Sequence, residues 1–147
     1  RQSQKQVKLK SEIENNFFIN SRNSIYIKNE IGYLNSKNYL TNELFRIGGP
    51  TSVRGFNEQS FFTKQYTFIN TEYRYISSKN SQLYTLLDYA YLKNINNNNN
   101  YLTSLGIGYK QLFKNTLINI EYSLGKSNND SFNFNNSFLS LKLSNYF

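Results

Sequence analysis

The side chains that could do chemistry in this chain are charged groups, because it contains 17 Lys and Arg and 9 Asp and Glu but no His and no Cys. Without His or Cys the chain cannot form a Ser-His-Asp triad, a thiolate nucleophile or a zinc site of nitrogen and sulfur ligands. Any metal would have to be a hard cation bound by carboxylates. We therefore expect no enzymatic activity, no catalytic residue, no metal site and no cofactor, and we look for ionic contacts instead.

The strongest candidate constellation begins in the long connection 35–61. It contains the glycine pair Gly48 and Gly49 and the only Pro of the chain, Pro50, among apolar residues. A connection of this length is usually functional or disordered, and its apolar residues favour an ordered element. We expect the connection to fold inward.

Acidic partners for such an element follow downstream. Glu72 and Arg74 lie in one alternating segment and Asp88 lies in the next. An Arg on an inward-folded loop would form charge-assisted forks with these carboxylates. The alternative for Glu72 and Asp88 is a merely solvated polar face.

The elements that must position these residues are strands, because apolar and polar residues alternate with period two. The abundance of Tyr (13) and Phe (12) also favours strands. The alternating segments are 7–13, 25–33, 65–76, 82–92, 102–112, 118–124 and 139–147. The sequence therefore predicts an all-β, antiparallel fold of about seven strands, with a loop at the asparagine run 96–100.

Two kinds of sheet protein show this alternation: a transmembrane β-barrel and a soluble β-sandwich. Tyr recurs near the predicted strand ends, as in the aromatic girdles of outer-membrane barrels, and short turns alternate with long loops. These features favour the barrel. About seven strands leave two unpaired edges, so we expect the carboxyl-terminal part of a barrel, completed by strands that precede Arg1 or by another copy or subunit.

Several motifs together resemble one family of barrels, the outer-membrane assembly and secretion family typified by BamA, TamA and the two-partner-secretion transporters. The resemblance covers nearly the whole chain. The motifs are Gly48-Gly49, Val53-Arg54-Gly55-Phe56, Glu72-Tyr73-Arg74, Asp88, Gly106-Ile107-Gly108 and a terminal Phe147. The resemblance implies a sixteen-stranded barrel with the loop 35–61 in its lumen, where Arg54 meets Glu72 and Asp88. It also implies that residues 1–147 are the carboxyl-terminal part, without the amino-terminal strands and periplasmic modules.

The resemblance further implies that the protein inserts outer-membrane proteins or translocates polypeptides. The implied location is the bacterial outer membrane, and the style rich in Asn and Tyr is similar to members from the Bacteroidota. The implied partners are outer-membrane lipid and lipopolysaccharide, unfolded outer-membrane or secreted polypeptides, accessory subunits and the remaining barrel strands.

The last strand has its own expected role. Alternation predicts that one set of side chains faces lipid and the other faces the lumen or seam. The expected lipid-facing residues are Leu139, Leu141, Leu143 and Phe147, and the others are Ser140, Lys142, Ser144 and Tyr146. Apolar residues at alternate positions before a terminal Phe are similar to the sorting signal of such barrels.

Other interpretations of the function remain open. The barrel could be a passive channel, or it could anchor an upstream enzymatic, patatin-like domain. Nucleic-acid binding, suggested by the net charge of +8, is disfavoured because the basic residues are scattered along the chain. Arg54 could gate the loop or only fasten it, and we expect Gly106 and Gly108 to pack against the loop.

Overall fold

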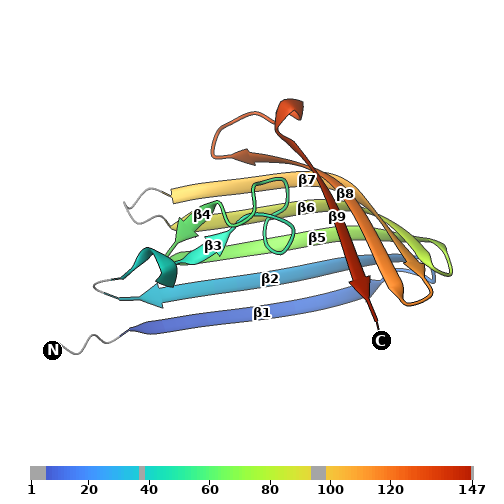
Figure 1. Ribbon diagram of the computed structural model, residues 1–147, viewed down its shortest axis with the longest axis horizontal. Coiled ribbons are helices and arrows are strands. Elements are labelled where there is room, and N and C mark those ends of the chain that lie inside the picture. The colour runs from blue at the N-terminus through green and yellow to red at the C-terminus, as the bar shows by residue number, and fades with distance from the viewer. Residues whose placement is uncertain (1–5, 37–38, 94–98, 147) are drawn as a thin grey trace.

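Seven long strands form one antiparallel sheet in the computed structural model, which describes residues 6–36, 39–93 and 99–146 (Figure 1). Their order in the sheet is β1-β2-β5-β6-β7-β8-β9. The strands are β1 (Val7–Phe18), β2 (Asn23–Asn35), β5 (Gln65–Ser78), β6 (Ser81–Lys93), β7 (Asn99–Phe113), β8 (Thr116–Ser127) and β9 (Ser137–Asn145). The predicted all-β fold with seven antiparallel strands is confirmed.

Helical structure in the described residues is limited to two 3-10 turns, Thr41–Glu43 and Phe134–Asn136. None of the helices in that part of the chain is long and apolar enough to cross a membrane.

The two ends of the sheet carry different connections. At one end the strands are joined by the tight turns 19–22, 79–80 and 114–115. The connections 36–64 and 128–136 lie at the other end (Figure 1). The predicted alternation of short turns and long loops is therefore present. The loop predicted at the asparagine run 96–100 is wrong for Asn99 and Asn100, which belong to β7 and pair with β6. Residues 94–98 lie outside the described residues.

The two faces of the sheet have opposite chemistry. Large apolar side chains on the convex face are exposed, as shown by Leu87 at 54%, Ile107 at 61% and Leu141 at 65%. Polar and charged residues alternate with them on the concave face, where Glu72 and Asp88 are buried. Most exposed apolar side chains thus point outward and most charged side chains point toward the interior of the curve, as the period-two pattern predicts. Some apolar residues of the concave face, such as Phe68, Leu92 and Leu102, are buried instead.

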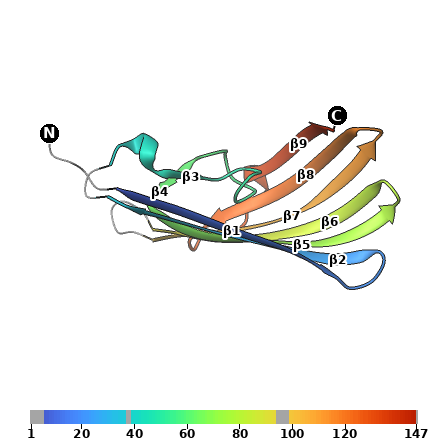
Figure 2. The ribbon, with the colours of Figure 1, turned by 90° about the horizontal axis from the view of Figure 1, so that it is seen from below.

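The long connection between β2 and β5 lies over the concave face (Figure 2). It contains a short hairpin of β3 (Phe45–Ile47) and β4 (Phe61–Thr63), which the sequence analysis did not predict. Three-residue strands are too short to show a period. By the bounds of β2 and β5 the connection is 36–64, slightly longer than the expected loop 35–61. The expectation that this element is ordered and folded inward agrees with its position.

Apolar packing holds the connection against the sheet. A single buried cluster joins residues of the connection to residues of β2, β5, β6 and β7. Its members are Leu34, Leu44, Phe45, Ile47, Val53, Tyr66, Phe68, Ala90, Leu92 and Leu102. The ring of Phe45 meets Tyr66 edge to face with centroids 5.0 Å apart, and the Nζ of Lys8 lies 4.6 Å from the centroid of Phe45. The core of this chain therefore lies between the connection and the concave face.

Both outer strands of the sheet have one unpaired edge among the described residues, because β1 pairs only with β2 and β9 pairs only with β8. Antiparallel neighbours alternate in direction. In a sheet of seven strands the first and the last, β1 and β9, therefore run in the same direction (Figure 1).

The packing predicts that Phe45→Ala loosens the connection. Removing a buried aromatic ring costs about 3 to 5 kcal/mol, so we expect faster protease cleavage within residues 40–60. The matched control is Phe62→Ala, since Phe62 is 38% exposed on the neighbouring strand β4. Equal cleavage of the two variants would contradict the packing role of Phe45.

Candidate functional site

The candidate site forms where residues 48–56, the tip of the inward connection, meet the concave face. Gly48 and Gly49 have φ values of 115° and 93°, a region that favours glycine. A hydrogen bond from Gly49 N to Val53 O (2.9 Å) and one from Gly48 N to Ser52 Oγ (2.8 Å) close the tip into a compact turn. This turn fixes the backbone that carries Arg54.

The next residue, Gly55, packs directly against the backbone of β8. It has a φ of 76°, and a Cβ there would lie 2.6 Å from the backbone N of Gly125. The ring of Phe56 lies against the same glycine, 2.8 Å from the position of a Gly125 Cβ. Only a pair of glycines allows the two backbones to approach so closely.

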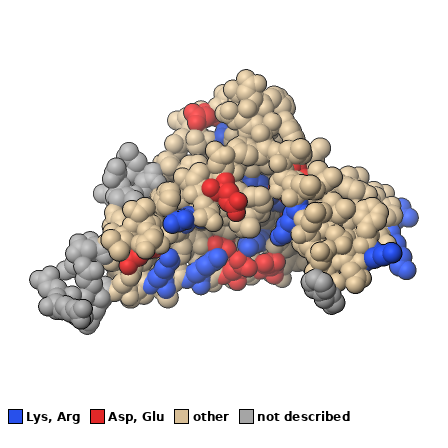
Figure 3. All heavy atoms as spheres, viewed as in Figure 1, with Lys and Arg blue, Asp and Glu red and all other residues tan. Residues whose placement is uncertain are grey.

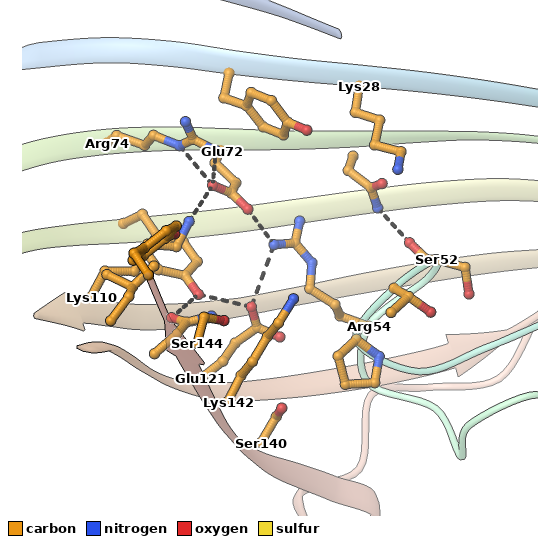
Figure 4. A pocket seen from close by; sticks show the side chains of 18 residues that line it. Lys28, Ser52, Arg54, Glu72, Arg74, Lys110, Glu121, Ser140, Lys142 and Ser144 are labelled. Carbon is orange, nitrogen blue, oxygen red and sulfur yellow. Dashed lines mark hydrogen bonds and ion pairs between the residues drawn. The ribbon is translucent and has the colours of Figure 1, made fainter. Parts of the chain in front are cut away.

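The guanidinium of Arg54 contacts three carboxylates from three strands, and Figure 4 shows two of them, Glu72 and Glu121. It donates from Nε to Asp88 Oδ2 (2.8 Å) and from Nη2 to Asp88 Oδ1 (2.5 Å), and the backbone N of Arg54 also donates to Asp88 (3.0 Å). Its Nη1 lies 2.5 Å from Glu72 Oε1 and 3.4 Å from Glu121 Oε2. The structure thus places Arg54 on both acidic residues named in the sequence analysis and on a third, Glu121.

The charged side chains of this site are buried. Arg54 is 6% exposed, Glu72 is 5% exposed and Asp88 is 0% exposed. Burial disfavours the charge of Arg54, but hydrogen bonding and charge from Asp88, with the charges of Glu72 and Glu121, outweigh burial and raise the pKa of Arg54 above its usual value. The guanidinium therefore stays charged, and the interaction is a permanent ionic clamp.

A second layer of side chains surrounds the clamp. Glu72 also accepts from Arg74 Nε (2.7 Å) and lies 3.5 Å from Lys110 Nζ. The hydroxyl of Tyr84 donates to Glu121 (2.9 Å). Three cations and three carboxylates therefore balance one another around the tip.

Sequence reasoning missed Glu121, Lys110 and Tyr84 as members of this site. A signal was available, because Glu121 and Lys110 occupy the polar positions of their alternating segments and so share the concave face with Glu72. What the sequence does not contain is the register that brings them together, such as the pairing of Gly108 with both Tyr84 and Glu121.

The expectation that Gly106 and Gly108 pack against the loop is wrong. A Cβ at Gly108 would overlap the ring of Tyr84, 2.5 Å from its Cε1, and a Cβ at Gly106 would lie 2.9 Å from Ser123 Cα on β8. Gly108 lets the Tyr84 side chain cross β7 to reach Glu121. The glycine that touches the loop is Gly125.

The remaining predicted residues are accounted for as follows. Val53 is fully buried in the core cluster and Phe56 is half-buried beside Phe61, with ring centroids 5.4 Å apart. The convex side of β9 carries Leu139, Leu141 and Leu143, all exposed. Phe147 lies outside the described residues.

A polar cavity of about 440 Å³ lies between the tip, the concave face and β9 (Figure 4). Five cationic side chains line it, together with Glu72 and Glu121. The cations are Lys28, Arg54, Arg74, Lys110 and Lys142. Within the described ranges, no group of three or more His, Cys, Asp and Glu is arranged to hold a metal ion.

Comparison with known proteins adds no assignment: no family model and no curated protein matches this chain.

The clamp predicts a large effect for Arg54→Ala. This change leaves the buried carboxylate of Asp88 uncompensated, at a cost of about 3 to 5 kcal/mol, so we expect the tip to detach and residues 45–60 to become sensitive to limited proteolysis. Arg46→Ala is the control, because exposed Arg46 on β3 contacts no carboxylate: it donates to Gln59 (3.3 Å) and lies over the ring of Phe62. Unchanged protection in Arg54→Ala would show that the clamp does not hold the loop.

Proposed function

We propose that this sheet is part of a transmembrane β-barrel in the bacterial outer membrane, with its convex face in lipid and the inward connection in the lumen. The exposed apolar residues of the convex face support this. They occur on all seven strands, and leaving so continuous an apolar face in water would be unfavourable. Charged residues, in contrast, gather on the concave face, where a barrel holds its water-filled interior.

Strand direction constrains how such a barrel would close. Since β1 and β9 run in the same direction, a second copy in the same membrane orientation would place its β1 parallel to β9. An antiparallel barrel that contains these seven strands needs an odd number of further strands, from the same polypeptide or from a different subunit. In hydrocarbon each unpaired backbone group costs several kcal/mol, which makes closure necessary.

We propose further that this barrel inserts outer-membrane proteins or translocates polypeptides. The observation that carries this proposal is the clamp between Arg54 of the inward connection and Glu72 and Asp88 of β5 and β6. In the family that the sequence resembles, the Arg of the corresponding loop motif meets acidic residues on the two strands that follow the loop. The proposed partners are therefore unfolded polypeptides, together with outer-membrane lipid and lipopolysaccharide around the barrel.

The membrane placement predicts opposite environments for two neighbouring residues of β9. The chain has no Cys, so Leu141→Cys and Lys142→Cys can each carry one environment-sensitive dye. In lipid bilayers, brominated acyl chains should quench the dye at position 141 on the convex face at least about threefold more than the dye at position 142 on the concave face. Equal quenching would contradict a lipid-facing convex surface.

The function predicts that the full-length protein in proteoliposomes accelerates folding of a urea-unfolded outer-membrane protein, measured as the heat-modifiable fraction. Arg54→Ala should slow this by about tenfold or more, because a tenfold change needs only about 1.4 kcal/mol and loss of the clamp costs about 3 to 5 kcal/mol; Arg46→Ala should not slow it. If the protein releases small solutes from the liposomes but neither folds nor translocates a polypeptide, it is a passive channel or an anchor.

A further inference from the structure

Positive charge is concentrated at one end of the sheet, the end that carries the tight turns. Each of the three turns contributes one exposed cation, namely Arg22, Lys79 and Lys114, and none of the three turns contains an Asp or Glu. Figure 3 shows blue but no red at this right-hand end of the molecule. We call these three residues the turn cations.

The opposite end does not share this charge. Its connections carry Glu43, Glu58 and Asp130 beside their basic residues. The two ends of the sheet therefore differ in charge, although the chain as a whole is basic.

The positive charge continues from the turn cations into the cavity. Lys110 on β7 and Lys142 on β9 face the same residue of β8, Asn119, so the three residues form one row across the concave face. From the spacing of strands, the backbones of the two lysines lie about 10 Å apart. This row lies between the turns and the Arg54 clamp.

Lys142 differs from the other cavity cations in having no counter-charge. Arg54, Arg74 and Lys110 balance three carboxylates, and Lys28 is paired with Glu12 (2.9 Å). Lys142 makes no ion pair with any residue in the part of the chain that the structure describes. It is exposed, and its side chain points into the cavity toward the clamp (Figure 4).

We propose that the turn cations and Lys142 form a docking path for acidic, extended segments of polypeptide, with Lys142 as the inner contact. The cavity supplies hydroxyl groups next to this lysine, from Ser140, Ser144 and Tyr146, that can donate to a carboxylate. Along an extended peptide, side chains on one side repeat at about 7 Å, so acidic residues at alternate positions would all face the cations from one side of the peptide. The positive charge of the turn cations would also speed the association with an acidic polypeptide.

Lipid phosphate is the other anion that could meet the turn cations. It could reach them from outside the barrel, but Lys142 lies on the concave face, the side turned away from the apolar convex surface. The interior position of Lys142 therefore favours a polypeptide over a lipid. This inference rests on the proposed function, because it names the substrate class that the barrel would receive.

The test measures binding of two unstructured fluorescent peptides to the full-length protein in uncharged detergent, by fluorescence anisotropy at low and high salt. One peptide carries Glu at alternate positions and the other carries Gln at the same positions. We expect the Glu peptide to bind more tightly at low salt. Lys142→Gln should weaken its binding about threefold to fivefold, the loss of one partly exposed ion pair.

The matched control is Lys93→Gln, which removes the same charge from the end of β6 at the opposite end of the sheet. It should leave binding unchanged, and neutralising the three turn cations together should mainly slow association. Equal affinities for the Glu and Gln peptides, or equal affinities of Lys142→Gln and Lys93→Gln, would overturn the proposal. So would a result in which neutralising the turn cations weakens only the binding of anionic phosphatidylglycerol vesicles, because the cations would then serve lipid.

The peptide-binding test of the docking path and the client-folding test of the proposed function can fail independently. Folding of an outer-membrane client without preference for the Glu peptide would overturn only the docking path. Preference for the Glu peptide without client folding would overturn the proposed function and leave an acidic-peptide site.

Discussion

The bidentate contact between Arg54 and Asp88 is the interaction on which the inward connection depends. Asp88 is fully buried, and within the described chain every hydrogen bond to its carboxylate comes from Arg54. Glu72 is different, because it also contacts Arg74 (2.7 Å) and Lys110 (3.5 Å). Withdrawal of the tip would therefore leave one buried charge without a partner, and that charge is Asp88 rather than Glu72.

This contact requires a backbone that approaches the sheet more closely than side chains normally allow. Left-handed glycines shape the tip, and Gly55 rests directly on Gly125 of β8. A similar device operates within the sheet, where Gly108 leaves room for Tyr84 to cross β7 and reach Glu121. The missing Cβ atoms are thus as necessary to the ionic clamp as the charged groups, because they let its members come within hydrogen-bond distance.

The sequence predicted the strands well because each is long enough to repeat its period several times, and alternation alone assigns every side chain to a face. It could not predict β3 and β4, which have no period, or the start of β7 at Asn99, where backbone pairing overrides the loop preference of Asn. Glu72 and Asp88 were predicted as partners of Arg54 because the alternation puts them on one face of the sheet and because the family resemblance implies the contact. Glu121 and the true contacts of Gly106 and Gly108 depend on strand register and side-chain direction, which a period-two pattern does not contain.

The Arg54 clamp contacts some strands of the sheet and not others. The carboxylates bound by Arg54 lie on β5, β6 and β8, so the clamp ties the connection to the middle of the sheet. It does not extend to β9, which within the described residues pairs only with β8 and contributes no ion pair to the clamp. A displacement of β9 would break its ladder with β8 but none of the contacts of Arg54. The ion pairs that fasten the connection and the backbone hydrogen bonds that hold β9 are therefore separate sets of contacts.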